Sequence, residues 1–358
     1  MLRLKVDIPL LLGLFLLSLA SLLILYSAGG ENMRIIVSQS LRMLVAFSVM
    51  MGVAQVRPDT LFRWSPLIFI VGLILLVLVL LIGHTGKGAT RWLDLGFFRF
   101  QPSEIMKLAV PMMLACVLTR RTLPPSNKSL IYAVTVLFIP AVLIYEQPDL
   151  GTALMIMMSG TIIIFMAGFA WRNIIILTAC GGVAAPLLWH FLLHDYQRRR
   201  ILTVIDPWSD PLGDGYQSIQ SMIAIGSGGG QGKGWLQGSQ SQLEFIPERH
   251  TDFIFSVFSE EFGFIGVLML LSLYLFITAR GLYIAYYTKD TYSRLLAGSL
   301  SMTFFFYVFV NIGMVAGMLP VVGVPLPLIS YGGTSMVTLM AGFGILMGIH
   351  GHRSLMSR

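Results

Sequence analysis

Uninterrupted apolar runs recur along the whole chain of 358 residues and restrict its fold more than any other feature. A run of about 20 apolar residues can cross the hydrocarbon core of a bilayer as a helix. Inside a bilayer every backbone polar group needs an internal partner, which a helix provides. About ten such runs predict an all-α polytopic membrane protein. The predicted spans lie near residues 8–28, 34–55, 64–83, 103–120, 129–146, 151–170, 173–193, 254–280, 295–318 and 331–350.

Composition agrees with a membrane protein. Charged residues make up 11% of the chain and hydrophobic residues 56%, whereas soluble domains carry roughly 25% charged residues. The apolar runs continue from end to end, so residues 1–358 are expected to form a single membrane domain. The net charge of +7 is explained by span ends that face the cytoplasm. No nucleic-acid partner is therefore expected.

Arginine and lysine are distributed unequally between the two sets of span ends. Most of them belong to the set that includes both chain termini, whereas the short loops opposite carry only Arg34, Lys87, Arg91 and Arg99. Positive charge marks cytoplasmic loops. Both termini are therefore expected in the cytoplasm, with the segment 194–252 outside.

The segment 194–252, between the seventh and eighth predicted spans, is the one large polar part of the sequence. Loops longer than about 15 residues are usually functional or disordered, and its mixture of apolar and turn residues indicates order. It is expected to be a large extracytoplasmic loop. Its cationic residues are Arg198, Arg199, Arg200, Lys233 and Arg249.

A glycine-rich stretch, GSGGGQGKGW (226–235), superficially resembles a phosphate-binding loop. That motif requires glycine where this chain has Ser227, and serine or threonine where it has Gly234. Two interpretations stay open. The stretch is a plain flexible turn, or its glycines let backbone N–H groups near Lys233 approach an anionic lipid headgroup.

Two acidic motifs are expected to form a turn or a helix cap. The aspartates of DPWSDPLGDGYQ (206–217) lack the alternating spacing of a calcium loop, and Asp-Pro pairs are typical of turns. In EQPDLGTA (146–153), Asp149 precedes an apolar run and is expected to cap its helix. A place at the rim of a site is the second interpretation for Asp149.

The fourth predicted span opens with FRFQPSEIMKLAV (98–110), which places two charges inside an apolar run. Pro102 and Ser103 suit a helix start, and Glu104 and Lys107 lie three residues apart on one face. They either neutralise each other as an ion pair or form the polar lining of a cavity. Both interpretations can hold together.

The stretch GMLPVVGVPLPLISYGGTS (317–335) contains too many prolines and glycines for a regular helix. Broken backbone at membrane depth is tolerated where protein buries it or where it lines a wet cavity. Ser330 and Tyr331, which open the last span, are expected to face such a cavity.

The stretch IPERHTDFIFSVFSEEFG (246–263) gathers His250, Asp252, Glu260 and Glu261 where the eighth span begins. Thr251 is a candidate N-cap, which makes Asp252 the first helical residue, and the helix dipole would stabilise an acid there. Glu260 and Glu261 cannot both face lipid comfortably. At least one acid must therefore look into the protein, which predicts a polar cavity that opens outward beside Asp252.

Three long motifs, GYQSIQSMIAIGSGGGQGKGW, LEFIPERHTDFIFSVFSEEFGFIG and PLPLISYGGTS, closely resemble those of the SEDS family of shape, elongation, division and sporulation proteins. The resemblance covers nearly the whole chain, and PERHTDF favours the elongation branch. It implies a peptidoglycan glycosyltransferase of the bacterial inner membrane that polymerises lipid II on the outer face. It also implies a class B penicillin-binding protein as the activating partner.

The resemblance assigns the family's essential aspartate to Asp252 and its intramembrane acid and lysine to Glu104 and Lys107. In the implied reaction the GlcNAc 4-hydroxyl attacks MurNAc C1 with inversion, and undecaprenyl pyrophosphate leaves. Asp252 is either the general base for that hydroxyl or a ligand of a divalent cation, Mg²⁺ or Mn²⁺, on the pyrophosphate. The residues expected to bind substrate or line the cavity are Glu104, Lys107, Arg198, Arg199, Arg200, Lys233, Glu248, Arg249, Ser330 and Tyr331.

Two other classes of function fit parts of the sequence. Intramembrane charges and broken helices also occur in transporters, so a lipid II flippase is one alternative. A flippase needs access from both faces, whereas the ionisable groups cluster on one. The other alternative is a non-catalytic scaffold of the wall-synthesis complex, which would have no need of Asp252.

Overall fold

The computed structural model describes residues 5–86, 89–94, 99–120, 123–168, 195–213, 215–243 and 245–356, with positions 175, 182, 190 and 191. In that part of the chain, 8 helices are long and apolar enough to cross a membrane. They are α1 (Ile8–Ala28), α2 (Met33–Ala54), α3 (Pro58–Ile82), α4 (Pro102–Thr119), α5 (Asn127–Tyr145), α11 (Ile254–Tyr287), α12 (Thr291–Val315) and α13 (Thr334–Met356). The shorter apolar helix α6 (Leu150–Met166) occupies the sixth predicted span. The all-α polytopic fold is confirmed, and the predicted span near 173–193 lies outside the described residues.

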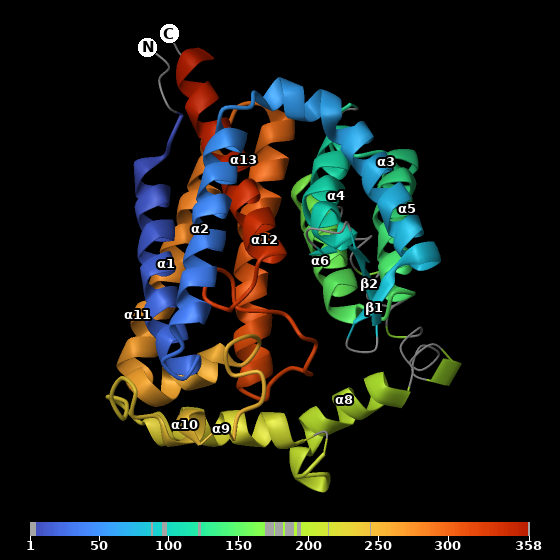
Figure 1. The fold of residues 1–358 in the computed structure, drawn as a ribbon. Coiled ribbons are helices and arrows are strands. Elements are labelled where there is room, and N and C mark those ends of the chain that lie inside the picture. The colour runs from blue at the N-terminus through green and yellow to red at the C-terminus, as the bar shows by residue number, and fades with distance from the viewer. Residues whose placement is uncertain are drawn as a thin grey trace.

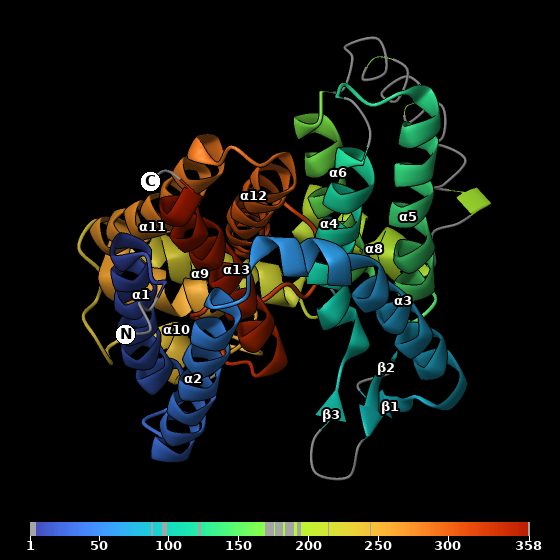
Figure 2. The ribbon, with the colours of Figure 1, turned by 90° about the horizontal axis from the view of Figure 1, so that it is seen from above.

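The spans form two groups that meet along α4 (Figures 1 and 2). One group contains α1, α2, α11, α12 and α13, and the other contains α3, α4, α5 and α6. Helix α12 packs against both α4 and α6, and α13 packs against α4. Most residues of α4 are buried as a result, including Glu104 near its start. The polar residues of α4 therefore face protein rather than lipid.

Short polar side chains fix where several helices begin. The carboxylate of Asp7 accepts from the Leu10 amide at 2.9 Å before α1, and Asp149 accepts from the Thr152 amide at 3.3 Å before α6. Each satisfies an amide that the first helical turn leaves without an intrahelical partner. The capping role predicted for Asp149 is confirmed.

A small antiparallel sheet lies between α3 and α4 and was not predicted from the sequence. Its strands are β1 (His84–Gly86), β2 (Ala89–Asp94) and β3 (Arg99–Phe100), in the order β1-β2-β3. The strands are too short to show a clear alternation of apolar and polar residues. Strand β2 packs against α3 and α4, and the sheet lies beside these two helices in Figure 2.

The segment 194–252 forms a row of short helices across one end of the bundle (Figure 1). It contains α8 (Asp195–Ile205), the 3-10 turn η2 (Pro207–Ser209), α9 (Tyr216–Gly228) and α10 (Ser239–Gln242). Helix α9 packs against α11 and α12. Asp206 accepts from the Trp208 amide and Asp210 from the Gly213 amide, both at 3.1 Å. The predicted turn chemistry is confirmed for these two aspartates, and Asp214 lies outside the described residues.

Helix α11 is broken at Gly263, where φ is +61°. The glycine-rich segment 228–234 crosses this bend and bonds to both of its sides. The amides of Lys233 and Gly234 donate to the carbonyls of Glu260 and Glu261, each at 3.0 Å. The amide of Phe264 donates back to the Gly229 carbonyl at 2.9 Å. We call this arrangement the backbone clasp, and it corrects the prediction of one unbroken span at 254–280.

Candidate active site

Asp252 lies in a turn ahead of α11 rather than in the helix itself. Helix α11 begins at Ile254, and its N-cap residue is Phe253. The predicted N-cap role of Thr251 is therefore wrong. The Thr251 hydroxyl instead lies 2.9 Å from the Glu248 carboxylate, to which it donates within the same turn. A polar side chain can bond locally in this way instead of capping a helix.

The backbone of Asp252 is held by a side chain that the sequence reasoning missed. Asn311 in α12 is fully buried, and its amide nitrogen donates to the Asp252 carbonyl at 2.9 Å. The same nitrogen donates to the Val324 carbonyl at 2.7 Å. One amide therefore ties the turn that carries Asp252 to both α12 and the α12–α13 connection. The only signal in the sequence was an asparagine within an apolar span.

The α12–α13 connection supports the same turn from its other side. It is not helical between residues 320 and 333, as the prolines and glycines predicted. The Ser330 hydroxyl donates to the Thr251 carbonyl at 2.6 Å and accepts from the Leu326 amide at 2.8 Å. The Tyr331 amide donates to the His250 carbonyl at 2.9 Å. Ser330 and Tyr331 thus hold the turn in place.

The carboxylate of Asp252 lies near Gly323, an exposed residue of the α12–α13 connection. A methyl group built on Gly323 would lie 3.6 Å from the Asp252 Oδ2 atom, and Gly323 itself is exposed with φ +72°. Asp252 is half-buried. The half-buried carboxylate of Asp252 therefore lies beside an exposed glycine of this connection.

A cation of α2 lies beside this turn and was not among the predicted site residues. The Arg42 guanidinium lies 4.4 Å from the centroid of the Tyr331 ring, within the range of a cation–π contact. The Tyr331 hydroxyl lies 3.3 Å from the Ser38 hydroxyl. Arg42 lies inside the apolar run predicted as the span at 34–55, and such a charge marks a functional site by default.

Glu104 and Lys107 form a buried ion pair at 2.7 Å. Lys107 also lies 5.5 Å from the centroid of the Tyr307 ring in α12. The second carboxylate oxygen of Glu104 is buried and has no partner within the described part of the chain. The pair neutralises itself, and Lys107 still reaches the wall of a cavity.

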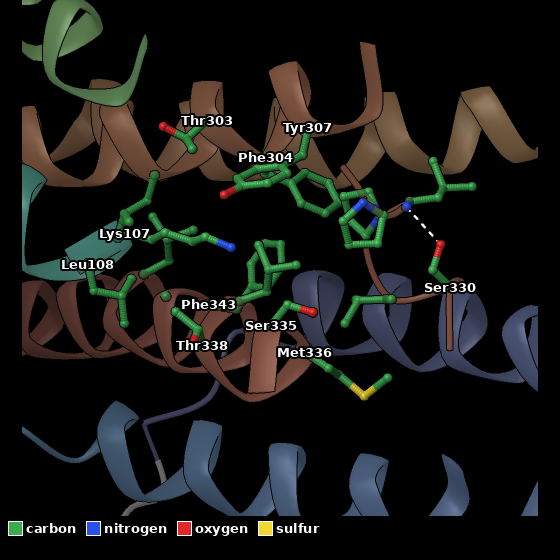
Figure 3. Close-up of a pocket in the computed structure, with 18 residues that line it drawn as sticks. Lys107, Leu108, Thr303, Phe304, Tyr307, Ser330, Ser335, Met336, Thr338 and Phe343 are labelled. Atoms are coloured by element: carbon green, nitrogen blue, oxygen red, sulfur yellow. Dashed lines mark hydrogen bonds between the residues drawn. The ribbon is translucent and has the colours of Figure 1, made fainter. Parts of the chain in front are cut away.

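That cavity lies between α4, α12, α13 and the α12–α13 connection (Figure 3). Its lining is mainly apolar, with polar groups from Lys107, Thr303, Tyr307, Ser330, Ser335 and Thr338. The structure thus brings Lys107 and Ser330, which the sequence placed in different motifs, to one cavity. Through Ser330 the cavity adjoins the turn of Asp252.

The other predicted cations lie elsewhere. Lys233 pairs at 2.7 Å with the fully buried carboxylate of Glu260, which also accepts from the amides of Gln240 and Ser241 at the start of α10. Arg249 donates to the Ser241 carbonyl. Lys233 and Arg249 therefore contact the α10 region.

The three consecutive arginines belong to α8, at the far end of the row of short helices. Arg198 donates to the His190 carbonyl at 3.0 Å. Arg200 lines a groove between α8 and α9. None of the three lines the cavity that contains Lys107.

A divalent cation at Asp252 would depend on the substrate. Among the described residues, no group of three or more His, Cys, Asp or Glu side chains is arranged to hold a metal. Mg²⁺ is commonly bound by one or two carboxylates together with substrate phosphates. Asp252 fits that mode only if pyrophosphate oxygens supply the other ligands.

The fold and the site together define a polytopic helical membrane protein. At one end of its bundle, α12 and the α12–α13 connection hold the turn that carries Asp252. A model of the FtsW, RodA and SpoVE family, described as cell cycle protein, matches residues 1–355. The chain belongs to this family, which is the SEDS family that its motifs resembled.

Relatives and solved structures agree over nearly the whole chain. The peptidoglycan glycosyltransferase MrdB of Escherichia coli K12 is 49% identical over 99% of this chain and 96% of its own. The probable peptidoglycan glycosyltransferase FtsW of Tolumonas auensis is 33% identical over 96% and 90%. The higher identity to MrdB agrees with the elongation branch.

Two solved structures share the fold. One is described as "Structural coordination of polymerization and crosslinking by a peptidoglycan synthase complex", with TM-score 0.86, 32% identity and coverage of 98% and 99%. The rod shape determining protein RodA of Thermus thermophilus gives TM-score 0.73 at 27% identity, with 96% coverage of each chain.

Proposed function

We propose that this protein is a peptidoglycan glycosyltransferase that joins lipid II units by β-1,4 bonds during cell elongation. The observation that carries the proposal is the 49% identity to a peptidoglycan glycosyltransferase over 99% of the chain. The alignment with this relative covers nearly the whole of both chains. The geometry of the Asp252 turn supports the roles assigned below.

Asp252 is the general base of this reaction. The GlcNAc 4-hydroxyl of one lipid II attacks C1 of MurNAc in the other and forms the new C1–O bond. The bond from C1 to the pyrophosphate oxygen breaks, and undecaprenyl pyrophosphate leaves with that electron pair. The hydroxyl proton passes to the Asp252 carboxylate, a transfer typically worth 10²–10⁴-fold in rate. The position of Asp252 beside exposed Gly323 leaves room for the sugar.

The leaving pyrophosphate needs positive charge near Asp252. Arg42 lies against Tyr331, whose amide bonds to the same turn. Lys107 lies on the wall of the adjoining cavity, but Glu104 neutralises it. Arg42 is therefore the cation that the protein holds in place before substrate arrives, and preorganised charge stabilises a developing anion more than mobile charge does. A bound Mg²⁺ or Mn²⁺ would add Lewis-acid stabilisation of the pyrophosphate.

The cavity of Figure 3 is suited to the polyprenyl chain. Its walls include Leu300 and Phe304 of α12 and Leu339 and Phe343 of α13, which present apolar surface to the cavity. An apolar chain gains free energy when such surface is removed from water. The headgroup of the same molecule would then lie at Ser330 and the Asp252 turn.

We assign both termini to the cytoplasm and the Asp252 turn to the outer face of the inner membrane. The positive-inside distribution supports this orientation. The start of α1 and the end of α13 lie at the end of the bundle opposite α8, α9 and α10 (Figure 1). The activating partner is a class B penicillin-binding protein, which crosslinks the product.

The test uses the purified complex of this protein and its class B partner, with lipid II and no ATP. Glycan polymer is followed on a gel for the wild type, Asp252→Asn and the matched control Asp206→Asn. Polymer is expected from the wild type and the control but not from Asp252→Asn. Undiminished polymer from Asp252→Asn would reduce Asp252 to a structural residue. If the complex forms and the wild type makes no polymer, a flippase or a scaffold replaces the enzyme.

A further inference from the structure

A second recess lies at the same end of the molecule, between the end of α8 and the start of α9. It is formed by three separate parts of the chain: the row of short helices, the residue before Glu248 and the α12–α13 connection. The lining residues are Arg200, Thr203, Val204, Leu212, Gly213, Tyr216, Gln217, Ser218, Pro247 and Val321. We call this recess the α8–α9 groove.

Four of the ten residues that line the α8–α9 groove have polar, uncharged side chains, a larger share than in the cavity of Figure 3. Tyr216, Gln217 and Ser218 make no side-chain hydrogen bond within the described part of the chain, and Ser218 is buried. Thr203 donates to the Arg199 carbonyl at 2.9 Å and keeps its oxygen as an acceptor. The groove therefore offers hydrogen bonds of both kinds beside one aromatic ring.

The groove also adjoins the candidate active site through two of its walls. Val321 lies two residues before Gly323, whose backbone meets the Asp252 carboxylate. Pro247 lies one residue before Glu248, where the turn that carries Asp252 begins. A chain of sugars with one end at Asp252 could extend into this groove along residues 321–323.

We propose that the α8–α9 groove binds the glycan strand next to the reacting sugar, so the site is a saccharide subsite of the enzyme. This inference rests on the proposed function. Sugars present many hydroxyl groups and an apolar face, and sites for such ligands combine a few placed polar groups with aromatic surface. Arg200 adds one cation near the lactyl or peptide carboxylates of the strand.

The polar character argues against the other parts of lipid II as the occupant. A polyprenyl tail would leave the hydroxyl and amide groups of the groove without partners, which costs free energy. Pyrophosphate prefers several convergent cations, and Arg200 is the one cationic residue among the lining residues.

The test measures binding of a soluble, lipid-free GlcNAc–MurNAc tetrasaccharide to the complex in nanodiscs by saturation-transfer NMR. The variants are Gln217→Ala, Thr203→Val and their combination. The matched control is Gln242→Ala, which removes an exposed glutamine from α10 outside the groove. We expect the double variant to bind about tenfold more weakly, since two hydrogen bonds are lost, and to make shorter glycan products from lipid II.

Asp252→Asn separates this inference from the proposed function. That variant is expected to bind the tetrasaccharide normally although it makes no polymer. The inference is overturned if the wild type fails to bind the tetrasaccharide, if the double variant binds it like Gln242→Ala, or if inorganic pyrophosphate displaces it. Complex formation and thermal melting verify that each variant is folded. If the wild type binds the tetrasaccharide but makes no polymer, the proposed function fails and the groove remains a saccharide-binding site without that reaction.

Discussion

The buried amide of Asn311 donates a hydrogen bond of 2.9 Å to the carbonyl of Asp252, 59 residues away in the chain. The same nitrogen bonds to the Val324 carbonyl at 2.7 Å. The position of Asp252 therefore depends on how α12 and its following connection pack. Asn311 is a positioning residue, because it acts on the reaction only through Asp252.

Replacing Asn311 with alanine is expected to lower kcat by about 10- to 100-fold while KM changes little. Small displacements of a reacting group can cost about 10²-fold, and substrate binding involves other residues. The measurement is the rate of lipid II polymerisation against substrate concentration. Ser299→Ala is the control, because Ser299 is also buried in α12 and loses a 3.0 Å hydrogen bond to the Ser159 carbonyl. Equal losses in both variants would show a general effect of destabilisation.

Gly263→Ala is expected to prevent stable folding. A Cβ atom at this position would lie 2.2 Å from the Gly232 amide nitrogen, and φ of +61° is unfavourable for alanine. The yield of monodisperse protein in detergent measures the effect. Gly226→Ala is the control, since nothing lies within 4 Å of its Cβ position inside α9. Gly226→Ala is expected to be neutral or stabilising by about 1 kcal/mol. Normal yield of both variants would show that folding does not depend on the backbone clasp.

Lys233→Met is expected to lower stability by about 2 kcal/mol, because it leaves the buried Glu260 carboxylate without its cation. Adding Glu260→Gln should restore part of the loss. A double-mutant cycle from thermal melting gives the coupling between the two residues. If Lys233 serves the substrate instead, the single variant will raise KM for lipid II and leave the melting temperature unchanged.

Stability is expected to fall in acid because of Asp7. Burial raises the pKa of Asp7, but hydrogen bonds from Arg280 and the Leu10 amide outweigh it and place the pKa below its ordinary value of 3.8. A carboxylate with a lowered folded-state pKa stabilises the protein above its unfolded pKa, and this contribution is lost as pH falls through the folded pKa. Melting temperature measured from pH 6 to pH 3 should decrease. The decrease should be smaller in Asp7→Asn, and an equal decrease would exclude Asp7 as its source.

The parts of the fold that depend on local sequence could be predicted. A span needs only a run of apolar residues, and the capping role of Asp149 follows from its place before such a run. The ion pair of Glu104 and Lys107 follows from helical spacing. The broken connection before α13 follows from its prolines and glycines. Each of these features lies within a few residues of its cause.

The parts that depend on distant contacts could not be predicted. Nothing near Gly263 indicates a bend, because the bend exists only with residues 228–234 packed against it. Asn311 and Arg42 reach the site from α12 and α2, and their partners lie far away in the sequence. Lys233 pairs with Glu260 instead of reaching the cavity, and this contact too joins residues that are far apart in the sequence. A single sequence records residue types but not which of them meet.

The backbone clasp tolerates side-chain substitutions better than insertions or deletions of residues. Its hydrogen bonds join backbone atoms of consecutive residues on both sides of the Gly263 bend, so one inserted or deleted residue between 229 and 233 would shift every partner. At Gln231, which is exposed, an exchanged side chain leaves those bonds intact. An epitope tag inserted into this stretch would therefore disable the protein, whereas a single cysteine at position 231 would give a harmless site for attaching a fluorophore.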